Sequence, residues 1–206
     1  MRSGNVLLVA AAALGVAWSG GAHAADPRYP DWPCAQAKVP ELSVAAVWDG
    51  PSIDAVGEAW KDDAKVRNLV ALLAARRTPL DDAKKAAADF VGEGGGDKTE
   101  KAKLLFAGLF ESLNQQRSEV MDGIERIARK EKELAETVRA DRAGLSELQD
   151  AQNPDQQKIE ELTNRLQWGT RIFEERRKTI RYVCEVPIVI ERRLFALGRA
   201  IAQAAE

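Results

Sequence analysis

The sequence contains a single histidine, His23, and its surroundings indicate that even this one is removed. Residues 1–24 follow the layout of a secretory signal peptide, with Arg2, an apolar stretch from Val6 to Ala17 and an ending at Ala22-His23-Ala24. An uncleaved anchor is the weaker alternative, because the stretch is about a dozen residues and a membrane-spanning helix needs ~20. We expect cleavage after Ala24, export to the periplasm and no membrane span afterwards. Without imidazole, Ser-His-Asp catalysis, Cys-His catalysis and His-rich zinc sites are excluded.

Cysteine is almost as scarce, since Cys34 and Cys184 are the only two. An even number in a chain addressed to an oxidising compartment predicts one disulfide bond. Closing a loop of about 150 residues would stabilise the fold by roughly 4–5 kcal/mol in the chain-entropy model. Two free thiols are the alternative, but no Cys-x-x-C spacing supports a redox role.

The sequence also lacks an excess of one charge, with 30 Lys and Arg against 32 Asp and Glu. Nucleic-acid binding, which depends on a basic face, is therefore disfavoured. The glycine run 92–96 lacks the Gly-Lys-Ser/Thr ending of a phosphate loop, so no cofactor is expected. Adjacent acidic pairs are best explained as solvated helix faces, although a cation site built from distant carboxylates stays open; the pairs are Asp62-Asp63, Asp81-Asp82, Glu160-Glu161 and Glu174-Glu175.

Proline and tryptophan are concentrated in residues 25–51. Five prolines forbid a continuous helix there and favour an extended path: Pro27, Pro30, Pro33, Pro40 and Pro51. Because Trp32, Cys34 and Trp48 accompany them, we expect an ordered strap that lies on the helices and brings Cys34 to Cys184. A disordered leader is the alternative.

Two short helices and a flexible joint are predicted over residues 52–96. Ser52 would cap a first helix that ends near Arg77, because apolar residues follow it at mostly helical spacing. Thr78-Pro79 then suits the start of a second helix, 79–91, with threonine as the cap and proline at the first helical position.

Residues 97–206 predict two long helices that fold back on each other at 153–155, Asn-Pro-Asp. Apolar residues recur in steps of three and four on both sides of this turn, which is a heptad pattern. In an antiparallel pair, facing residues should have numbers that sum to about 307. This register places Glu131 opposite Arg176, two polar exceptions whose pairing would fix the alignment.

The sequence as a whole predicts an all-α protein built around this long antiparallel hairpin. The apolar zones are richest at the open end, where the two short helices would complete a four-helix bundle. Residues 117–176 would project as a two-helix, coiled-coil-like stalk, and Pro187 would kink or break the last helix.

Three tryptophans are candidate interaction residues, namely Trp32, Trp48 and Trp168. Trp32 and Trp48 are expected first of all to pack in the core; the functional alternative is a partner-binding face, since exposed tryptophan beside proline is a common anchor in protein association. Trp168 would lie on the stalk, where it either folds over the gap that Gly169 leaves opposite Val138 or contacts a partner.

No nucleophile with a base, no metal-ligand cluster and no cofactor loop is found, so an enzyme is not expected. The layout of signal peptide and long helical hairpin is similar to periplasmic holdase chaperones and to the hairpins of envelope adaptor proteins. The chain lacks the strong basic charge of the former and any β-rich, lipoyl-like segment of the latter. We expect a non-enzymatic scaffold or adaptor that binds a protein partner in the cell envelope. A holdase chaperone and an acidic-site metal-binding protein are the alternatives, and a homo-oligomer stays open.

Overall fold

The computed structural model describes residues 26–93 and 95–206, so the predicted signal peptide lies outside the described residues. Four α-helices account for most of this part of the chain: α1 (Ala64–Ala74), α2 (Leu80–Gly92), α3 (Lys98–Asp150) and α4 (Gln156–Ala205). Two short 3₁₀ helices, η1 (Val44–Ala46) and η2 (Ala59–Lys61), precede them. These ranges contain no β-strand, which confirms the predicted all-helical class.

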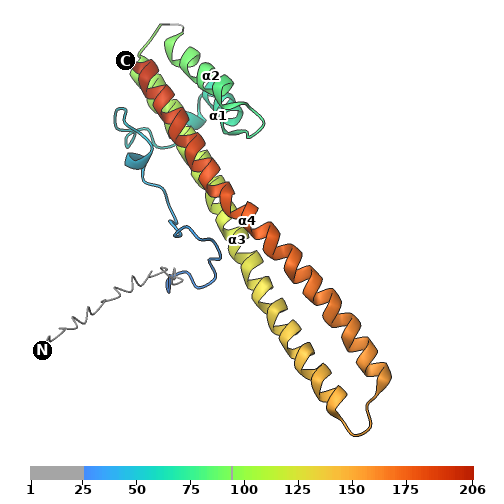
Figure 1. Ribbon diagram of the computed structural model, residues 1–206. Helices are drawn as coiled ribbons and strands as arrows, with labels where there is room; N and C mark the ends of the chain where they lie inside the picture. Colours follow the sequence, from blue (N-terminus) through green and yellow to red (C-terminus); the bar gives the residue numbers. More distant parts are fainter. Residues whose placement is uncertain (1–25, 94) are drawn as a thin grey trace, which may run out of the picture.

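The two long helices, α3 and α4, run side by side in opposite directions (Figure 1). Each begins at an aspartate whose carboxylate accepts backbone N–H bonds of the first turn. Asp97 accepts from Thr99 N at 2.9 Å, and Asp155 accepts from Lys158 N at 3.2 Å. At 1.5 Å per residue, the 53 residues of α3 span about 80 Å. We call the end near residues 150–156 the tip and the opposite end the base.

Ion pairs between α3 and α4 fix their alignment at three points along the pair. Arg117 pairs with Glu191, Glu131 with Arg176 and Asp141 with Arg165, so the paired numbers sum to 308, 307 and 306. A Cβ atom added at Gly169 would lie 3.1 Å from Val138 Cγ2, which agrees with the same register. The alignment is therefore the one that the heptad pattern predicts.

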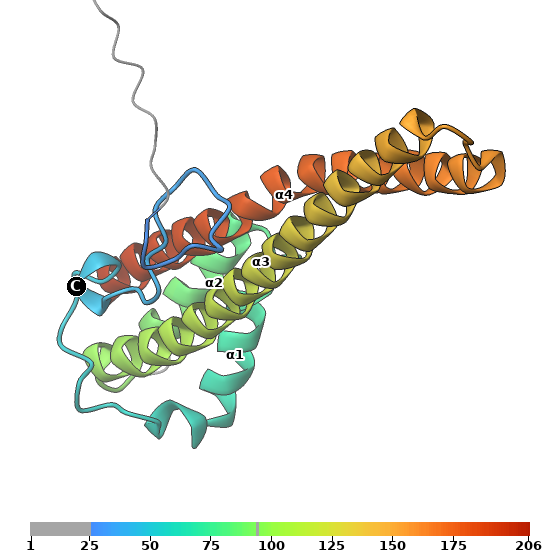
Figure 2. The ribbon, with the colours of Figure 1, turned by 90° about the horizontal axis from the view of Figure 1, so that it is seen from below.

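The apolar core lies at the base, where α1 packs on α3 and α2 packs on both α4 and α3 (Figure 2). The largest fully buried side chains come from all four helices and include Leu73, Val91, Leu105, Phe106, Leu109, Leu113, Leu194, Leu197 and Ile201. Toward the tip, only α3 and α4 remain in contact, and burial becomes sparser. No helix within residues 26–93 and 95–206 is both long enough and apolar enough to cross a membrane.

The first short helix begins later than predicted and ends earlier. Residues 53–63 form turns and η2, and α1 starts only at Ala64, with Asp63 accepting from Lys65 N and Val66 N at 2.7 and 3.2 Å. Ser52 instead accepts a bond from Asp54 N in a local turn, and Gly57 takes a positive φ of 50° that interrupts any helix through this segment. The predicted cap at Ser52 is therefore wrong.

The start of α2 also differs in detail from the prediction. Its N-terminal flanking residue is Pro79, which has no side chain that can cap the helix. The Thr78 hydroxyl instead donates to the carbonyl oxygen of Leu72 at 2.8 Å, and so it closes the C-terminal end of α1.

Pro187 lies inside α4 without breaking it, because the helix is continuous from Gln156 to Ala205. The side chain is buried. The predicted break is therefore wrong. Proline has no N–H, so the carbonyl of Val183, four residues earlier, has no helical donor at this position.

Candidate interaction site

The strap, residues 26–51, runs along the α3–α4 pair in the direction opposite to α3. Lys132 Nζ contacts Asp31 Oδ1 at 2.7 Å, Lys38 Nζ contacts Glu125 Oε1 at 2.7 Å, and Leu42 N donates to Asn114 Oδ1 at 3.4 Å. Residue numbers thus increase along the strap in the direction in which they decrease along α3. The strap is ordered over this length, and its path begins near the middle of α3 and ends in the core at the base.

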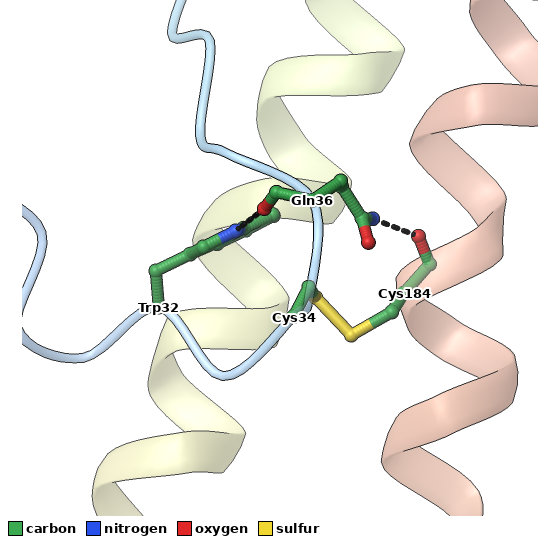
Figure 3. Close-up of a disulfide and its surroundings, with 4 residues drawn as sticks. All are labelled: Trp32, Cys34, Gln36 and Cys184. Atoms are coloured by element: carbon green, nitrogen blue, oxygen red, sulfur yellow. Dashed lines mark hydrogen bonds between the residues drawn. A yellow bond between two sulfur atoms is a disulfide. The ribbon is translucent and has the colours of Figure 1, made fainter. Parts of the chain in front are cut away.

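A disulfide joins the strap to α4 between Cys34 and Cys184, with the two Cα atoms 5.6 Å apart (Figure 3). The predicted bond is confirmed. Beside it, Gln36 Nε2 donates to the carbonyl oxygen of Cys184 at 2.6 Å, and Trp32 Nε1 donates to the carbonyl oxygen of Gln36 at 2.7 Å. The strap is attached one turn before Pro187, where the backbone hydrogen bonding of α4 is already interrupted.

Trp48 belongs to the core rather than to an interaction surface. It is 7% exposed, its ring stacks on Phe106 with centroids 4.1 Å apart, and its indole N–H donates to the carbonyl oxygen of Pro51 at 2.7 Å. Next to it, the carbonyl oxygen of Val47 approaches α4 so closely that a Cβ at Gly198 would lie 2.5 Å from it. The prediction of Trp48 as an interaction residue is wrong, because its apolar ring completes the base.

A groove of about 440 Å³ lies where the beginning of the strap crosses the α3–α4 pair. Pro30, Trp32 and Pro33 form its outer wall, and Trp32 is half-buried there. The helices contribute apolar and basic side chains, namely Ala128, Lys132 and Ala135 from α3 and Phe173, Arg177, Ile180 and Arg181 from α4. Asp31 also lines the groove and pairs with Lys132 at 2.7 Å, so the groove combines apolar side chains with charged side chains of both signs.

Glu131 lies at the bottom of this groove, in the seam between the two helices. Its side chain is 7% exposed, and the nearest atom of Arg176, Nε, lies 3.7 Å from Oε1, too far for a hydrogen bond. Neither carboxylate oxygen has a hydrogen-bond partner among the described residues. Burial raises the pKa of Glu131, and the guanidinium groups of Arg176 and Arg177 offset only part of that rise.

The other polar residues of the seam are satisfied. Asp141 accepts two bonds from the Arg165 guanidinium at 2.9 and 2.7 Å, and these bonds hold the pKa of Asp141 below its usual range. Arg117, which is buried, donates from Nε to Glu191 at 2.6 Å and from Nη1 to the carbonyl oxygen of Pro40 at 3.2 Å. Glu131 is thus the exception, and its side chain is the one that lines the groove, with both carboxylate oxygens covered.

Trp168 is 65% exposed on the far part of α4. The gap beside Gly169 is occupied by Val138 itself, so the predicted alternative in which Trp168 folds over that gap is wrong. Four more large apolar side chains on the same helix are also exposed, and two of them, Ile172 and Tyr182, lie on the same side of α4 as Trp168. Neither was predicted, although they are four and fourteen residues from Trp168, a spacing that places all three on one side of an α-helix.

The strap groove and the exposed side chains of α4 are surface features that this part of the structure offers for binding. Within residues 26–93 and 95–206, no three His, Cys, Asp or Glu side chains are grouped so that they could hold a metal ion. Comparison with protein-family models, curated proteins and solved structures found no match to this chain. The groove and the surfaces of the α3–α4 pair are therefore the features that bear on function.

Proposed function

We propose that this protein is a non-enzymatic scaffold or adaptor of the periplasm, with a four-helix base and a coiled-coil-like stalk, that binds a partner protein in the strap groove. The observation that carries the proposal is Glu131, a buried carboxylate without hydrogen bonds at the bottom of an open, largely apolar groove. Buried polar groups are normally satisfied, so an unsatisfied carboxylate in the wall of a groove marks this part of the seam as a place shaped for more than stability.

The residues that line the groove indicate which kind of partner segment would fit. Trp32 and Phe173 suit an apolar side chain. Arg177 and Arg181 at the rim suit a carboxylate beside that apolar side chain. We therefore expect an extended segment with one buried apolar residue and a neighbouring acidic one.

The periplasm is supported by the disulfide, because such bonds persist in oxidising compartments. The scaffold role is supported by the length of the α3–α4 pair, about 80 Å. The apolar core occupies only the base, so the rest of the pair is not needed to bury it.

An affinity pull-down from periplasmic extract tests the proposal, with the disulfide-bonded mature chain as bait. Trp32→Ala and Phe173→Ala should each lose the same dominant partner, because each removes one apolar wall of the groove. Trp168→Ala is the matched control, since it removes a large exposed aromatic that does not line the groove. A partner retained by both groove variants, or no dominant partner at all, would contradict the proposal.

A holdase chaperone is the second candidate, and the exposed apolar residues of α4 favour it: Trp168, Ile172, Tyr182, Val189 and Phe195. A holdase should suppress aggregation of a denatured model protein at near-stoichiometric ratios. An adaptor with one partner segment should not, and its pull-down should yield one dominant protein rather than many unfolded ones.

A further inference from the structure

A cavity of about 350 Å³ lies at the base, where the connection between α1 and α2 meets α4 (Figure 1). It is lined by Arg76, Leu80, Val189, Arg192 and Arg193, and we call it the arginine cavity. Three of its five lining residues are basic and none is acidic. It shares no lining residue with the strap groove, so the two are separate features of the molecule.

The three arginines of this cavity take part in no ion pair with any described residue. Acidic side chains close to them in sequence are bound elsewhere, since Asp81 pairs with Lys84 at 3.3 Å and Glu191 pairs with Arg117 at 2.6 Å. Asp82, in the first turn of α2, does not line the cavity. Like charges that lie close together without a counter-ion disfavour one another. The arginine cavity therefore carries positive charge that the chain itself does not compensate.

Arg193 is the most confined of the three arginines. Its Nε donates to the carbonyl oxygen of Leu73, near the end of α1, at 2.7 Å, and this bond uses one of the five N–H donors of the guanidinium. Its Nη2 is covered and has no hydrogen-bond partner, and no other side-chain nitrogen within residues 26–93 and 95–206 is in this state. Burial lowers the pKa of Arg193, because the charged form loses hydration. An anion in the cavity would offset that loss through its charge, without reaching Nη2.

The other two lining residues indicate what accompanies the negative charge. Leu80 is half-buried, and Val189 is 47% exposed although it lies in the wall of a cavity. An inorganic ion would leave this apolar surface in water, whereas an organic anion would cover it. Guanidinium groups bind phosphate and carboxylate oxygens through paired N–H bonds. The lining thus matches an oxyanion that is attached to a small apolar group.

We propose that the arginine cavity binds a small organic anion, with its phosphate or carboxylate group beside Arg76, Arg192 and Arg193 and its apolar part against Leu80 and Val189. The volume is at the lower end of the range for small-molecule sites. On α4 the lining covers only residues 189–193, which is about one turn, so a small molecule fits it better than a protein segment does. The proposal goes beyond the adaptor function, because it concerns another site and another class of ligand.

Thermal unfolding and calorimetric titration test the proposal, with the disulfide-bonded chain of residues 25–206. The probes are inorganic phosphate, phenyl phosphate and benzoate, each compared with sodium chloride at equal ionic strength. A ligand at about five times its Kd should raise the Tm by roughly 2–4 °C, because it binds only the folded protein. Phenyl phosphate should bind more tightly than inorganic phosphate, and its comparison with benzoate shows which oxyanion the site prefers.

Two variants test the lining residues separately. Arg76→Gln with Arg192→Gln should weaken the binding of phenyl phosphate by at least roughly tenfold, since it removes two charged donors. Both side chains are exposed, so their loss should leave the fold intact, and circular dichroism checks this. Val189→Thr keeps the shape of the side chain but makes it polar, and it should weaken the binding of phenyl phosphate while leaving inorganic phosphate unchanged.

Arg139→Gln with Arg142→Gln is the matched control. It removes the same two charges from exposed side chains on α3. These arginines flank Asp141, which pairs with Arg165 of α4, so they lie toward the tip and far from the arginine cavity. The control should leave the Kd of every probe unchanged.

The proposal would be overturned if none of the three anions raised the Tm above its value in sodium chloride, or if the control weakened binding as much as the cavity variant. Equal affinity for phenyl phosphate and inorganic phosphate, unaffected by Val189→Thr, would also overturn it, in favour of a site for an inorganic ion. The adaptor function can fail or stand independently, because its groove variants at Trp32 and Phe173 leave the arginine cavity intact.

Discussion

Glu131 differs from the other polar residues of the α3–α4 seam in the number of bonds that it forms. Asp141 is held by two bonds from Arg165, whereas the carboxylate of Glu131 is buried with an arginine 3.7 Å away. A buried ion without hydrogen bonds loses its hydration and regains only part of that energy. Burial of Glu131 therefore lowers the stability of the α3–α4 pair at this position.

This difference predicts opposite effects of pH at the two positions. Because burial raises the pKa of Glu131, its contribution to the free energy of unfolding is fully present below the unfolded pKa of about 4.3 and is lost as the pH rises through the folded value. Glu131→Gln should thus raise the free energy of unfolding at pH 7 by on the order of 1 kcal/mol and change it little at pH 4.

Asp141→Asn is the matched comparison, and its expected change in the free energy of unfolding at pH 7 has the opposite sign. Its pKa is lowered by the Arg165 bonds, so its contribution is present above the unfolded pKa of about 3.9 and is lost as the pH falls through the folded value. The substitution should lower stability at pH 7. Urea unfolding of both variants at the two pH values is the measurement, and a destabilised Glu131→Gln at pH 7 would show that attraction to Arg176 outweighs desolvation.

Two glycines in the long helices should respond in opposite ways to alanine. At Gly198 a Cβ would lie 2.5 Å from the carbonyl oxygen of Val47 and 3.0 Å from Phe106, so Gly198→Ala should displace the strap and destabilise the protein by about 1–3 kcal/mol. At Gly123 the nearest atom is Arg126 Nη2 at 3.7 Å, and Gly123→Ala should stabilise by up to about 1 kcal/mol, because alanine favours helix.

Urea unfolding measures both changes, and limited proteolysis within residues 26–51 reports on the strap directly. If Gly198→Ala and the unsubstituted protein had the same free energy of unfolding, the close approach of the strap to α4 would not contribute to stability.

Among the helices, the long ones could be predicted from sequence and the short ones only in part. A heptad repeat that continues for some fifty residues specifies both the helix and its alignment, which is why the ion pair of Glu131 and Arg176 follows from numbering alone. The start of α1 was missed because Ile53, Val56 and Trp60 have helical spacing but pack as successive turns around Gly57. Spacing does not distinguish one helix from a series of 3₁₀ turns.

The candidate site could be predicted less well than the helices, since it depends on where the strap lies. The sequence indicates that Cys34 meets Cys184, and this bond brings Trp32 to the groove. It does not decide whether Trp48 lies in the core or at the surface, because stacking on Phe106 depends on the folded path of the strap. The exposed apolar side chains of α4 are also visible only once it is known which faces α2 and the strap cover.

The molecule as a whole is long for its mass, and scattering in solution should detect this. A compact domain of 182 residues has a radius of gyration of about 16 Å, whereas a uniform rod of about 80 Å has one of about 23 Å. Small-angle X-ray scattering of residues 25–206 should give roughly 20–25 Å with an extended distance distribution. A value near 16 Å would mean that the tip folds back onto the base in solution.

The disulfide has one further consequence for the molecule. It closes the backbone into a ring that runs from Cys34 through α1, α2, α3 and the tip loop to Cys184. The tip loop, residues 151–155, is exposed and without helical structure, so it is open to a protease. A single cut there opens the ring without releasing a fragment, so nicked protein should migrate as one species on a non-reducing gel and as two after reduction.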